Sequence, residues 1–264
     1  MYSSENFTFV TGQATDVGCV REINEDSFLP LPESGVWVVA DGMGGHAAGD
    51  FASQLIVREL FSIGMPASAD DLQARFMERL HRANELIFQH SVELGAGSIG
   101  ATLASLLIHG SQYACIWSGD SRVYMQRAGV LTQISRDHTE VQLLLDSGTI
   151  SPQEAENWPR KNVITRAVGV TDTLQCDVTG GDLEVDDKFL ICSDGLNEYV
   201  SDAQISDILL RNDPQAACDI MVQETLNGGA KDNVTVIAIH CQEPPVQDGE
   251  EFGMDNTTDV AGLL

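Results

Sequence analysis

Short apolar runs separated by polar or glycine-containing bends fill the middle of the chain. Four strand-length runs follow one another here, at 101–108, 112–118, 122–126 and 130–134. The bends between them, such as Gly119-Asp120-Ser121, are far shorter than the dozen or more residues that a parallel crossover needs. The pattern therefore predicts an antiparallel meander and argues against a doubly wound parallel sheet.

Apolar residues at helical spacing come before and after this meander. Residues Ala48, Ala52, Ile56, Leu60 and Ile63 form one stripe, and a second stripe runs over 72–87. We expect both helices to lay an apolar face on a sheet. The same analysis predicts further strands at 7–17, 27–31, 36–40, 163–168, 174–178, 189–192 and 233–240, and further helices at 203–210 and 215–226.

Two segments lack a regular pattern. Residues 136–161 are polar and broken by proline, and we interpret them as a mobile insertion, the flap. Residues 243–264 carry six acids and no lysine or arginine, which is typical of a disordered acidic tail. Residues 1–242 are then expected to form one domain that contains the flap.

The same sequence pattern occurs twice: an apolar, strand-like run that ends in Asp-Gly. The first copy is VWVVADG at 36–42, followed by more glycines, and the second is KFLICSDG at 188–195. Glycine allows the backbone to approach an ion or a phosphate closely. Two strands that end in carboxylates suggest a shared metal site.

Charge narrows the range of partners. The 264 residues include 40 acidic and 14 basic side chains, for a formal net charge of -26. This excess makes nucleic acid and anionic membrane surfaces unlikely partners. The start of the chain lacks the basic and apolar segments of a signal peptide, and no apolar window is long enough to span a membrane. We expect a cytoplasmic monomer.

The candidate ligands are acids at the polar ends of apolar runs. Mg²⁺ and Mn²⁺ prefer several oxygen ligands and retain waters, whereas zinc would favour histidine and cysteine. Any one of these acids could equally cap a turn or a helix, but together they indicate a metal site. The set is Glu25, Asp26, Asp41, Asp120, Asp194 and Asp232.

Six motifs that contain these acids resemble one protein family. In chain order they are RxxNEDS at 21–27, DGMGGHAAG at 41–49, SGDSR at 118–122, RAVG at 166–169, SDGL at 193–196 and KDNVTV at 231–236. They are similar to the ordered motifs of bacterial metal-dependent serine/threonine protein phosphatases, the type 2C class. The resemblance implies an α+β fold, a four-layer α/β/β/α sandwich with two mainly antiparallel sheets flanked by helices.

The resemblance also implies roles for the acids. Asp41 would bridge two Mn²⁺ or Mg²⁺ ions, and the Gly42 carbonyl would bind one of them. Asp194 and Asp232 would hold the first ion, and Glu25 or Asp26 the second, directly or through water. Asp120, together with Asp194, would hold a weaker third ion.

Arg21 would grip the substrate phosphate through its planar guanidinium. A water between two cations about 3.5 to 4 Å apart is acidic enough to attack phosphorus at neutral pH. The implied reaction is hydrolysis of phosphoserine and phosphothreonine in proteins, in opposition to a bacterial Ser/Thr kinase.

Histidines have less certain roles. His46, in the glycine-rich bend, either protonates the leaving oxygen or stabilises the helix that starts there. His138, beside Asp137, is expected to be structural or a hinge to the flap. Many bacterial members of the family carry histidine before the flap proline, where this chain has Trp158-Pro159, so a role for that histidine does not transfer.

Two other functions compete with this interpretation. Residues 42–47 fit GxGxxA after a strand, with Glu59 near the place of a ribose-binding acid, so the chain could bind a dinucleotide. It could also be a catalytically inactive module that binds phosphoproteins. The meander argues against the first alternative, and the complete set of acids argues against the second.

Overall fold

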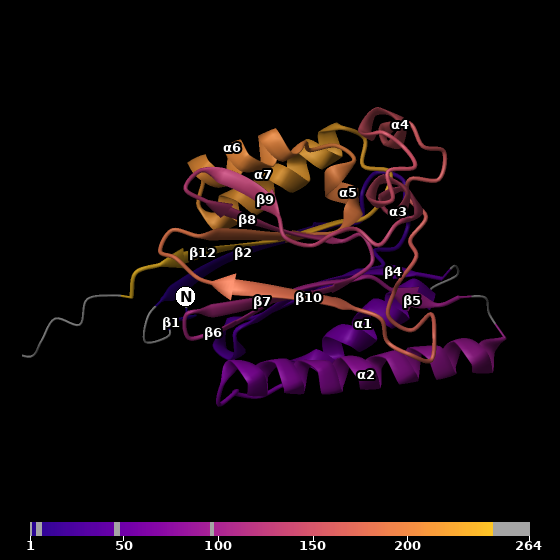
Figure 1. Ribbon diagram of the computed structural model, residues 1–264, viewed down its shortest axis with the longest axis horizontal. Coiled ribbons are helices and arrows are strands. Elements are labelled where there is room, and N and C mark those ends of the chain that lie inside the picture. Colours follow the sequence, from indigo (N-terminus) through magenta and orange to yellow (C-terminus); the bar gives the residue numbers. More distant parts are fainter. Residues whose placement is uncertain (1, 4–6, 45–47, 96–97, 245–264) are drawn as a thin grey trace, which may run out of the picture.

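Two antiparallel sheets pack face to face, and helices cover the outer face of each (Figure 1). This computed structural model describes residues 2–3, 7–44, 48–95 and 98–244. Helices α1 and α2 lie on one side of the paired sheets, and α5, α6 and α7 lie on the other. The predicted four-layer sandwich is confirmed.

The strands are β1 (Tyr2–Ser3), β2 (Thr8–Asp16), β3 (Asp26–Leu31), β4 (Val36–Met43), β5 (Gly100–Ala101), β6 (Leu103–His109), β7 (Gln112–Ser118), β8 (Arg122–Arg127), β9 (Val130–Gln133), β10 (Asp177–Asp182), β11 (Lys188–Cys192) and β12 (Val234–Gln242). The helices are α1 (Ala48–Phe61), α2 (Ala69–Leu94), α3 (Glu140–Asp146), α4 (Pro152–Glu156), α5 (Asp194–Asn197), α6 (Asp202–Arg211) and α7 (Pro214–Asn227), with a 3₁₀ turn over Pro32–Ser34. The two sheets have the strand orders β1-β2-β12-β11-β8-β9 and β10-β7-β6-β4-β3, and β5 pairs with β4.

The strand order corrects one part of the predicted meander. β6 pairs with β7, and β8 pairs with β9, both antiparallel as expected. β7 and β8, however, belong to different sheets. The Gly119-Asp120-Ser121 bend is therefore not a hairpin but a crossing from one sheet to the other, and it carries a candidate acid.

Strand β4 shows why its sequence is apolar throughout. Val36, Val38 and Ala40 face the core under α1 and α2, while Trp37 and Val39 face the core between the sheets. Because successive side chains of a strand point to opposite faces, a strand covered on both sides needs apolar residues at every position. β11 follows the same rule, with its alternate side chains divided between the inter-sheet core and the core under α5–α7. Burial on both faces places the polar ends of these strands, with Asp41 and Asp194, at the edge of the sandwich.

Two predicted strands were wrong. Residues 163–168 form only isolated bridges, Thr139 with Ile164 and Ala101 with Val168. The strand predicted at 174–178 lies at Asp177–Asp182 instead, as the sheet-edge strand β10. All residues of β10 are exposed, so no hydrophobic alternation marks it in the sequence.

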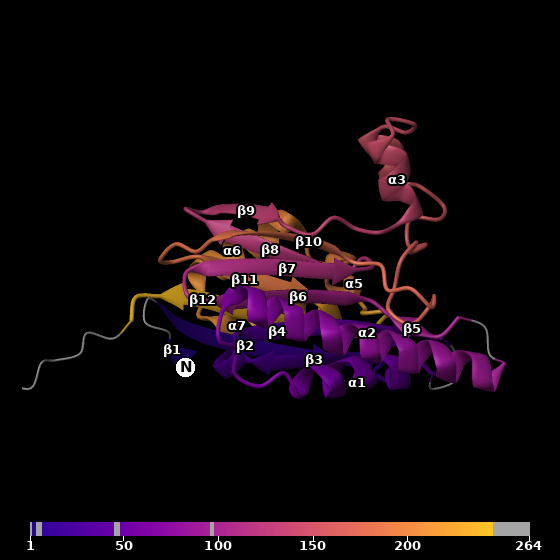
Figure 2. The same ribbon diagram turned by 60° about the horizontal axis from the view of Figure 1, so that its bottom comes forward.

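The flap contains two short helices, α3 and α4, both begun by a side-chain cap. Figure 2 shows α3 standing well away from the paired sheets.

The sheet around β4 excludes the dinucleotide-binding alternative, because β4 is antiparallel to both β3 and β6. Glu59 pairs with Arg82 of α2 at 3.3 Å, so it supports helix packing. Among the described residues, none of the helices has the length and apolarity to cross a bilayer.

Candidate active site

Five aspartates from separate segments gather where the two sheets end. Asp26 and Asp41 are cross-strand partners on β3 and β4 of one sheet. Asp194 begins α5 directly after β11, and Asp232 stands just before β12, in the other sheet. Asp120 lies in the bend that joins the sheets. The predicted acids therefore converge, and each sheet contributes part of the site.

A hydrogen bond ties the two halves of the site together. Ser193, at the end of β11, donates its hydroxyl to Asp26 Oδ2 at 2.8 Å. The other oxygen of that carboxyl, Asp26 Oδ1, is buried without a hydrogen-bond partner. A buried acceptor without a donor is costly, so its position fits a bound cation.

Asn233 organises the loop that carries Arg21 and Glu25. Its amide nitrogen donates to the carbonyls of Val17 and Ile23, at 2.9 and 3.0 Å, and its oxygen accepts from the Glu25 amide at 2.8 Å. Asn233 was not among the site residues predicted from the sequence. Its position between Asp232 and an apolar strand offered a signal, because a buried amide there needs several partners.

Close backbone approach brings Glu25 beside Asp41. The Gly42 amide donates to the Glu25 carbonyl at 3.1 Å. A Cβ on Gly42 would lie 2.1 Å from the Gly49 carbonyl oxygen, and a Cβ on Gly49 would lie 2.4 Å from Glu25 Oε1. Glycine is therefore required at both positions, and the Glu25 carboxylate rests against the first turn of α1.

The bend at Asp120 is tied to Asp41 through Thr102. Gly119 has a φ of +113°, and a Cβ there would lie 2.7 Å from the Thr102 side chain. Thr102 Oγ1 accepts from the Asp41 amide at 3.1 Å and lies 2.7 Å from the Ser121 hydroxyl. Thr102 was also missed from the sequence, where it is one polar residue inside an apolar run.

Burial and mutual repulsion raise the pKa values of these carboxyls. Desolvation, together with the nearby Asp194 and Asp232, raises the pKa of Asp26 to about 7. Desolvation, together with Asp194 and Asp137, raises the pKa of Asp120 to about 7. Desolvation and Asp232 raise the pKa of Asp194 to about 6. The pKa of Asp41 is raised well above its usual range, by desolvation and then by Asp26, Asp194, Asp120 and Asp232. Several acids that resist ionisation together are a site that favours a cation.

Arg21 stands at the edge of this cluster. Its Nη2 donates to Asp232 Oδ2 at 2.7 Å, and both side chains are partly exposed. The hydrogen bond to Asp232 raises the pKa of Arg21, with further contributions from Glu25 and Asp41. The guanidinium is thus next to the carboxylates and open to solvent, as a phosphate-binding group should be. His46 lies outside the described residues, so its assignment stays a prediction.

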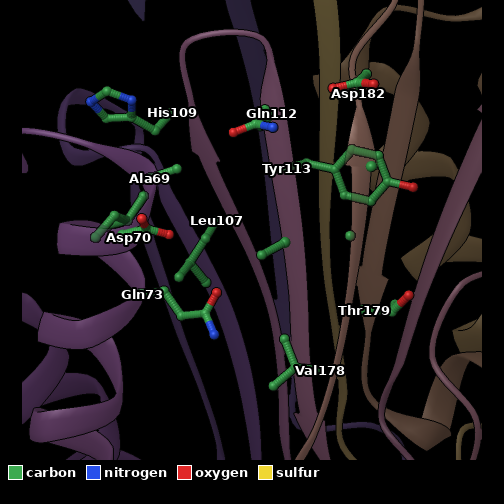
Figure 3. A pocket seen from close by; sticks show the side chains of 14 residues that line it. Ala69, Asp70, Gln73, Leu107, His109, Gln112, Tyr113, Val178, Thr179 and Asp182 are labelled. Atoms are coloured by element: carbon green, nitrogen blue, oxygen red, sulfur yellow. The ribbon is translucent and has the colours of Figure 1, made fainter.

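Two cavities distinguish this end of the molecule from the other. One of about 260 Å³ has Asp120 and Asp194 in its lining, with Val141 and Leu145 of α3 as part of the flap side. Another of about 480 Å³ lies between the start of α2 and the strands β7 and β10, and Figure 3 shows Gln73, Tyr113 and Thr179 around it. It sits at the opposite end of β7 from Asp120 and contains none of the clustered acids. The smaller cavity, which Asp120 and Asp194 share with the flap, is the part of the candidate site that is open to a substrate.

The donor set fits a hard divalent cation. All the clustered donor atoms are oxygens, the pKa values of four of the aspartates are raised, and Asp26 Oδ1 lacks a hydrogen-bond partner. In the described part of the chain, no three histidine, cysteine, aspartate or glutamate side chains converge closely enough to hold an ion unaided. Binding therefore needs side-chain adjustment or water ligands, which Mg²⁺ sites commonly use.

Comparison with known proteins agrees with this geometry. The family model described as protein phosphatase 2C matches residues 21–216. The chain belongs to the protein phosphatase 2C family. It is 35% identical over 249 residues to the serine/threonine protein phosphatase PstP of Mycobacterium tuberculosis. The aligned region covers 92% of this chain but 48% of PstP. The chain thus spans about half the length of that curated relative.

Solved structures of this family share the fold. PppA, described as a key regulatory component of T6SS in Pseudomonas aeruginosa, matches with a TM-score of 0.84 and 41% identity, covering 90% of this chain and 100% of that one. The catalytic domain of PstP in complex with two manganese ions matches with a TM-score of 0.81 and 34% identity, with the same coverages of 90% and 100%. The comparisons place the chain among protein phosphatases of the type 2C class.

Proposed function

We propose that this protein is a metal-dependent phosphatase that removes phosphate from phosphoserine and phosphothreonine in proteins. The observation that carries the proposal is the convergence of five aspartates, from both sheets, on one edge beside an exposed arginine. The raised pKa values of Asp26, Asp41, Asp120 and Asp194 support the proposal, because burial and neighbouring carboxyls both disfavour their ionisation unless a cation is bound. Membership of the protein phosphatase 2C family supports the same reaction.

The ions proposed for the site are Mn²⁺ or Mg²⁺. Asp41 would bind both core ions and the Gly42 carbonyl one of them, with Asp194 and Asp232 on the first ion and Glu25 or Asp26 on the second, directly or through water. Asp120 and Asp194 would hold a weaker third ion. When bound, such ions neutralise phosphate charge and acidify water for attack on phosphorus. The manganese complex of PstP supports metal use in this fold.

The protein's own groups then bind and orient the substrate. Arg21 presents its guanidinium beside Asp232, where an incoming phosphate can replace that carboxylate as the acceptor. Asn233 and the close approach of Gly42 to Glu25 fix the Arg21–Asp26 loop, so that the phosphate-binding and acidic groups keep one geometry. Positioning and charge neutralisation supply most of the acceleration in phosphoryl transfer.

Hydrolysis itself tests the proposal. A phosphothreonine peptide should be turned over with Mn²⁺ present, and turnover should stop after removal of the metal with EDTA and return when Mn²⁺ is restored. Binding of the phosphopeptide without release of phosphate would instead favour the inactive binding module. Full turnover after exhaustive chelation would reject metal-dependent chemistry.

Several finer features belong to the same proposal. We infer a phosphoprotein substrate, a cognate bacterial Ser/Thr kinase, a cytoplasmic setting, and a monomer without a nucleic-acid or membrane partner. We also infer that residues 1–242 form the phosphatase domain and that the acidic tail, 243–264, contributes to neither fold nor hydrolysis. Chromatography of the intact chain beside a chain that ends at residue 242, with melting temperature and turnover, tests the last two inferences.

A further inference from the structure

His138 holds both backbone groups of Gly119, the residue before Asp120. The His138 amide donates to the Gly119 carbonyl at 2.8 Å, and the Gly119 amide donates to His138 Nδ1 at 3.2 Å. That carbonyl belongs to the peptide that leads directly into Asp120. Because Gly119 adopts a positive φ that few residues accept, the direction of this peptide is set from outside the bend.

The opposite nitrogen of the ring contacts the segment that follows the flap. His138 Nε2 lies 3.1 Å from Asp177 Oδ2, and Arg166 Nη1 donates to Asp177 Oδ1 at 2.8 Å. Asp177 begins β10, and Arg166 precedes it, after the flap has ended. One imidazole therefore connects the Asp120 bend to the segment into which the flap returns.

The surroundings keep the ring neutral and fixed. An amide donates to Nδ1, so Nδ1 must be the acceptor and Nε2 must carry the proton that Asp177 accepts. The ring stacks on Trp117, with centroids 6.0 Å apart and an interplanar angle of 18°. Burial lowers the pKa of His138, with Asp177 acting in the opposite direction, so the neutral ring is favoured.

The neighbours of His138 anchor the same stretch of chain. Trp117 Nε1 donates to the Arg136 carbonyl at 2.8 Å, and Arg122 grips Asp137 with bonds of 2.7 to 3.1 Å. Residues 136–138, where the flap starts, are thus bound one after another to the strands on either side of Asp120. Among these residues of the described chain, His138 alone reaches the backbone of the bend, through its own amide and through Nδ1.

We propose that His138 is a positioning residue, which holds the Gly119 amide, one residue before Asp120, through Nδ1 and fixes the flap return through Nε2. The proposal rests on the proposed function for its effect on turnover, since Asp120 is assigned there to the third ion. It goes beyond a hinge or a general structural role, because it assigns a separate task to each ring nitrogen.

Three substitutions separate the two nitrogens. In His138→Asn the amide group takes the place of Nδ1, in His138→Gln it takes the place of Nε2, and His138→Ala retains neither. The matched control is His240→Asn. His240, near the end of β12, also faces an aspartate, Asp186 at 3.3 Å, but β12 carries it away from the clustered acids.

Amide hydrogen exchange at Gly119, measured in the metal-free protein, reports the first task directly. Loss of the acceptor should speed exchange roughly tenfold or more in His138→Ala and His138→Gln, and His138→Asn should stay within about threefold of wild type. With a phosphothreonine peptide, His138→Gln should need several-fold more Mn²⁺ for half-maximal turnover, whereas the Mn²⁺ requirement of His138→Asn should match that of wild type. His240→Asn should change neither quantity.

Equal exchange at Gly119 in the Asn and Gln variants would overturn the proposal, as would unchanged exchange in His138→Ala. The exchange experiment uses neither metal nor substrate, so its failure refutes the positioning role alone. Failure of the wild-type protein to release phosphate with Mn²⁺ would instead refute the proposed function and leave the exchange result standing.

Discussion

Replacing Arg21 with alanine separates phosphate binding from metal chemistry. In the structure Arg21 bonds Asp232 at 2.7 Å, and the two side chains are 49% and 39% exposed. A pair this exposed contributes under about 1 kcal/mol to stability, so the variant should fold normally. The loss should appear when substrate binds.

The size of that loss follows from the bond that a phosphate would make. A hydrogen bond to a charged group is worth about 1.5 to 3 kcal/mol, which corresponds to roughly 10- to 150-fold in kcat/KM. Metal affinity should change far less, because Arg21 touches only one of the proposed ligands, Asp232, at its exposed edge. Arg21→Lys should recover only part of the rate, since an ammonium cannot reproduce the planar fork.

The assay is steady-state hydrolysis of a phosphothreonine peptide at saturating Mn²⁺, with metal affinity measured separately by calorimetry. Arg211→Ala is the matched control, because Arg211 makes an exposed 2.7 Å pair with Asp207 at the end of α6. A decrease in kcat/KM of less than about threefold in Arg21→Ala would refute phosphate capture and leave Arg21 as a partner of Asp232 only.

Three other predictions concern the carboxylates. Asp41→Asn should lower turnover by about two orders of magnitude or more, because an amide cannot bridge two dications. It should also raise the melting temperature of the metal-free protein, because it removes repulsion between carboxylates. A wild-type rate would show that Asp41 is misassigned. Asp120→Asn should reduce turnover while calorimetry finds the two tightest ions bound as in wild type, and unchanged kinetics would remove Asp120 from the site. The raised pKa values of about 7 for Asp26 and Asp120 mean that the metal-free fold holds more protons than the unfolded chain between about pH 4 and pH 7, so its unfolding free energy should fall as pH rises through that range. Melting curves in EDTA from pH 5 to 8 should show a shallower decline for Asp26→Asn/Asp120→Asn than for wild type, and equal slopes would contradict these pKa values.

Sequence patterns predicted the elements whose burial is uniform. β4 and β11 are covered on both faces, so unbroken apolar runs identified them, and their terminal aspartates came with them. The position of β10 was predicted wrongly, because the strand is exposed along its whole length and has no apolar pattern. The sheet crossing at Gly119-Asp120-Ser121 escaped because a short bend looks the same whether its two strands pair with each other or join different sheets.

The acids of the site were predictable, but the residues that hold them were not. Each acid stands at the end of an apolar run inside a recognisable motif. Asn233, Thr102 and Ser193 act through contacts with segments distant in the chain, such as Ser193 with Asp26. A pattern in one segment carries no information on which distant partner it meets. Arg21 was predicted to bind phosphate at the site, but no sequence pattern indicated that Asp232 would be its partner in the structure.

The division of the acids between two sheets has a consequence for the lifetime of the protein. Asp26 and Asp41 belong to one sheet, and Asp194 and Asp232 adjoin the other, so like charges push the sandwich apart at this edge. A dication bound to both groups would link the two sheets, and its binding free energy would add to the resistance to opening. Scarcity of manganese or magnesium should then expose this edge to proteases. The supply of divalent ions would in that way govern how much of the folded protein persists.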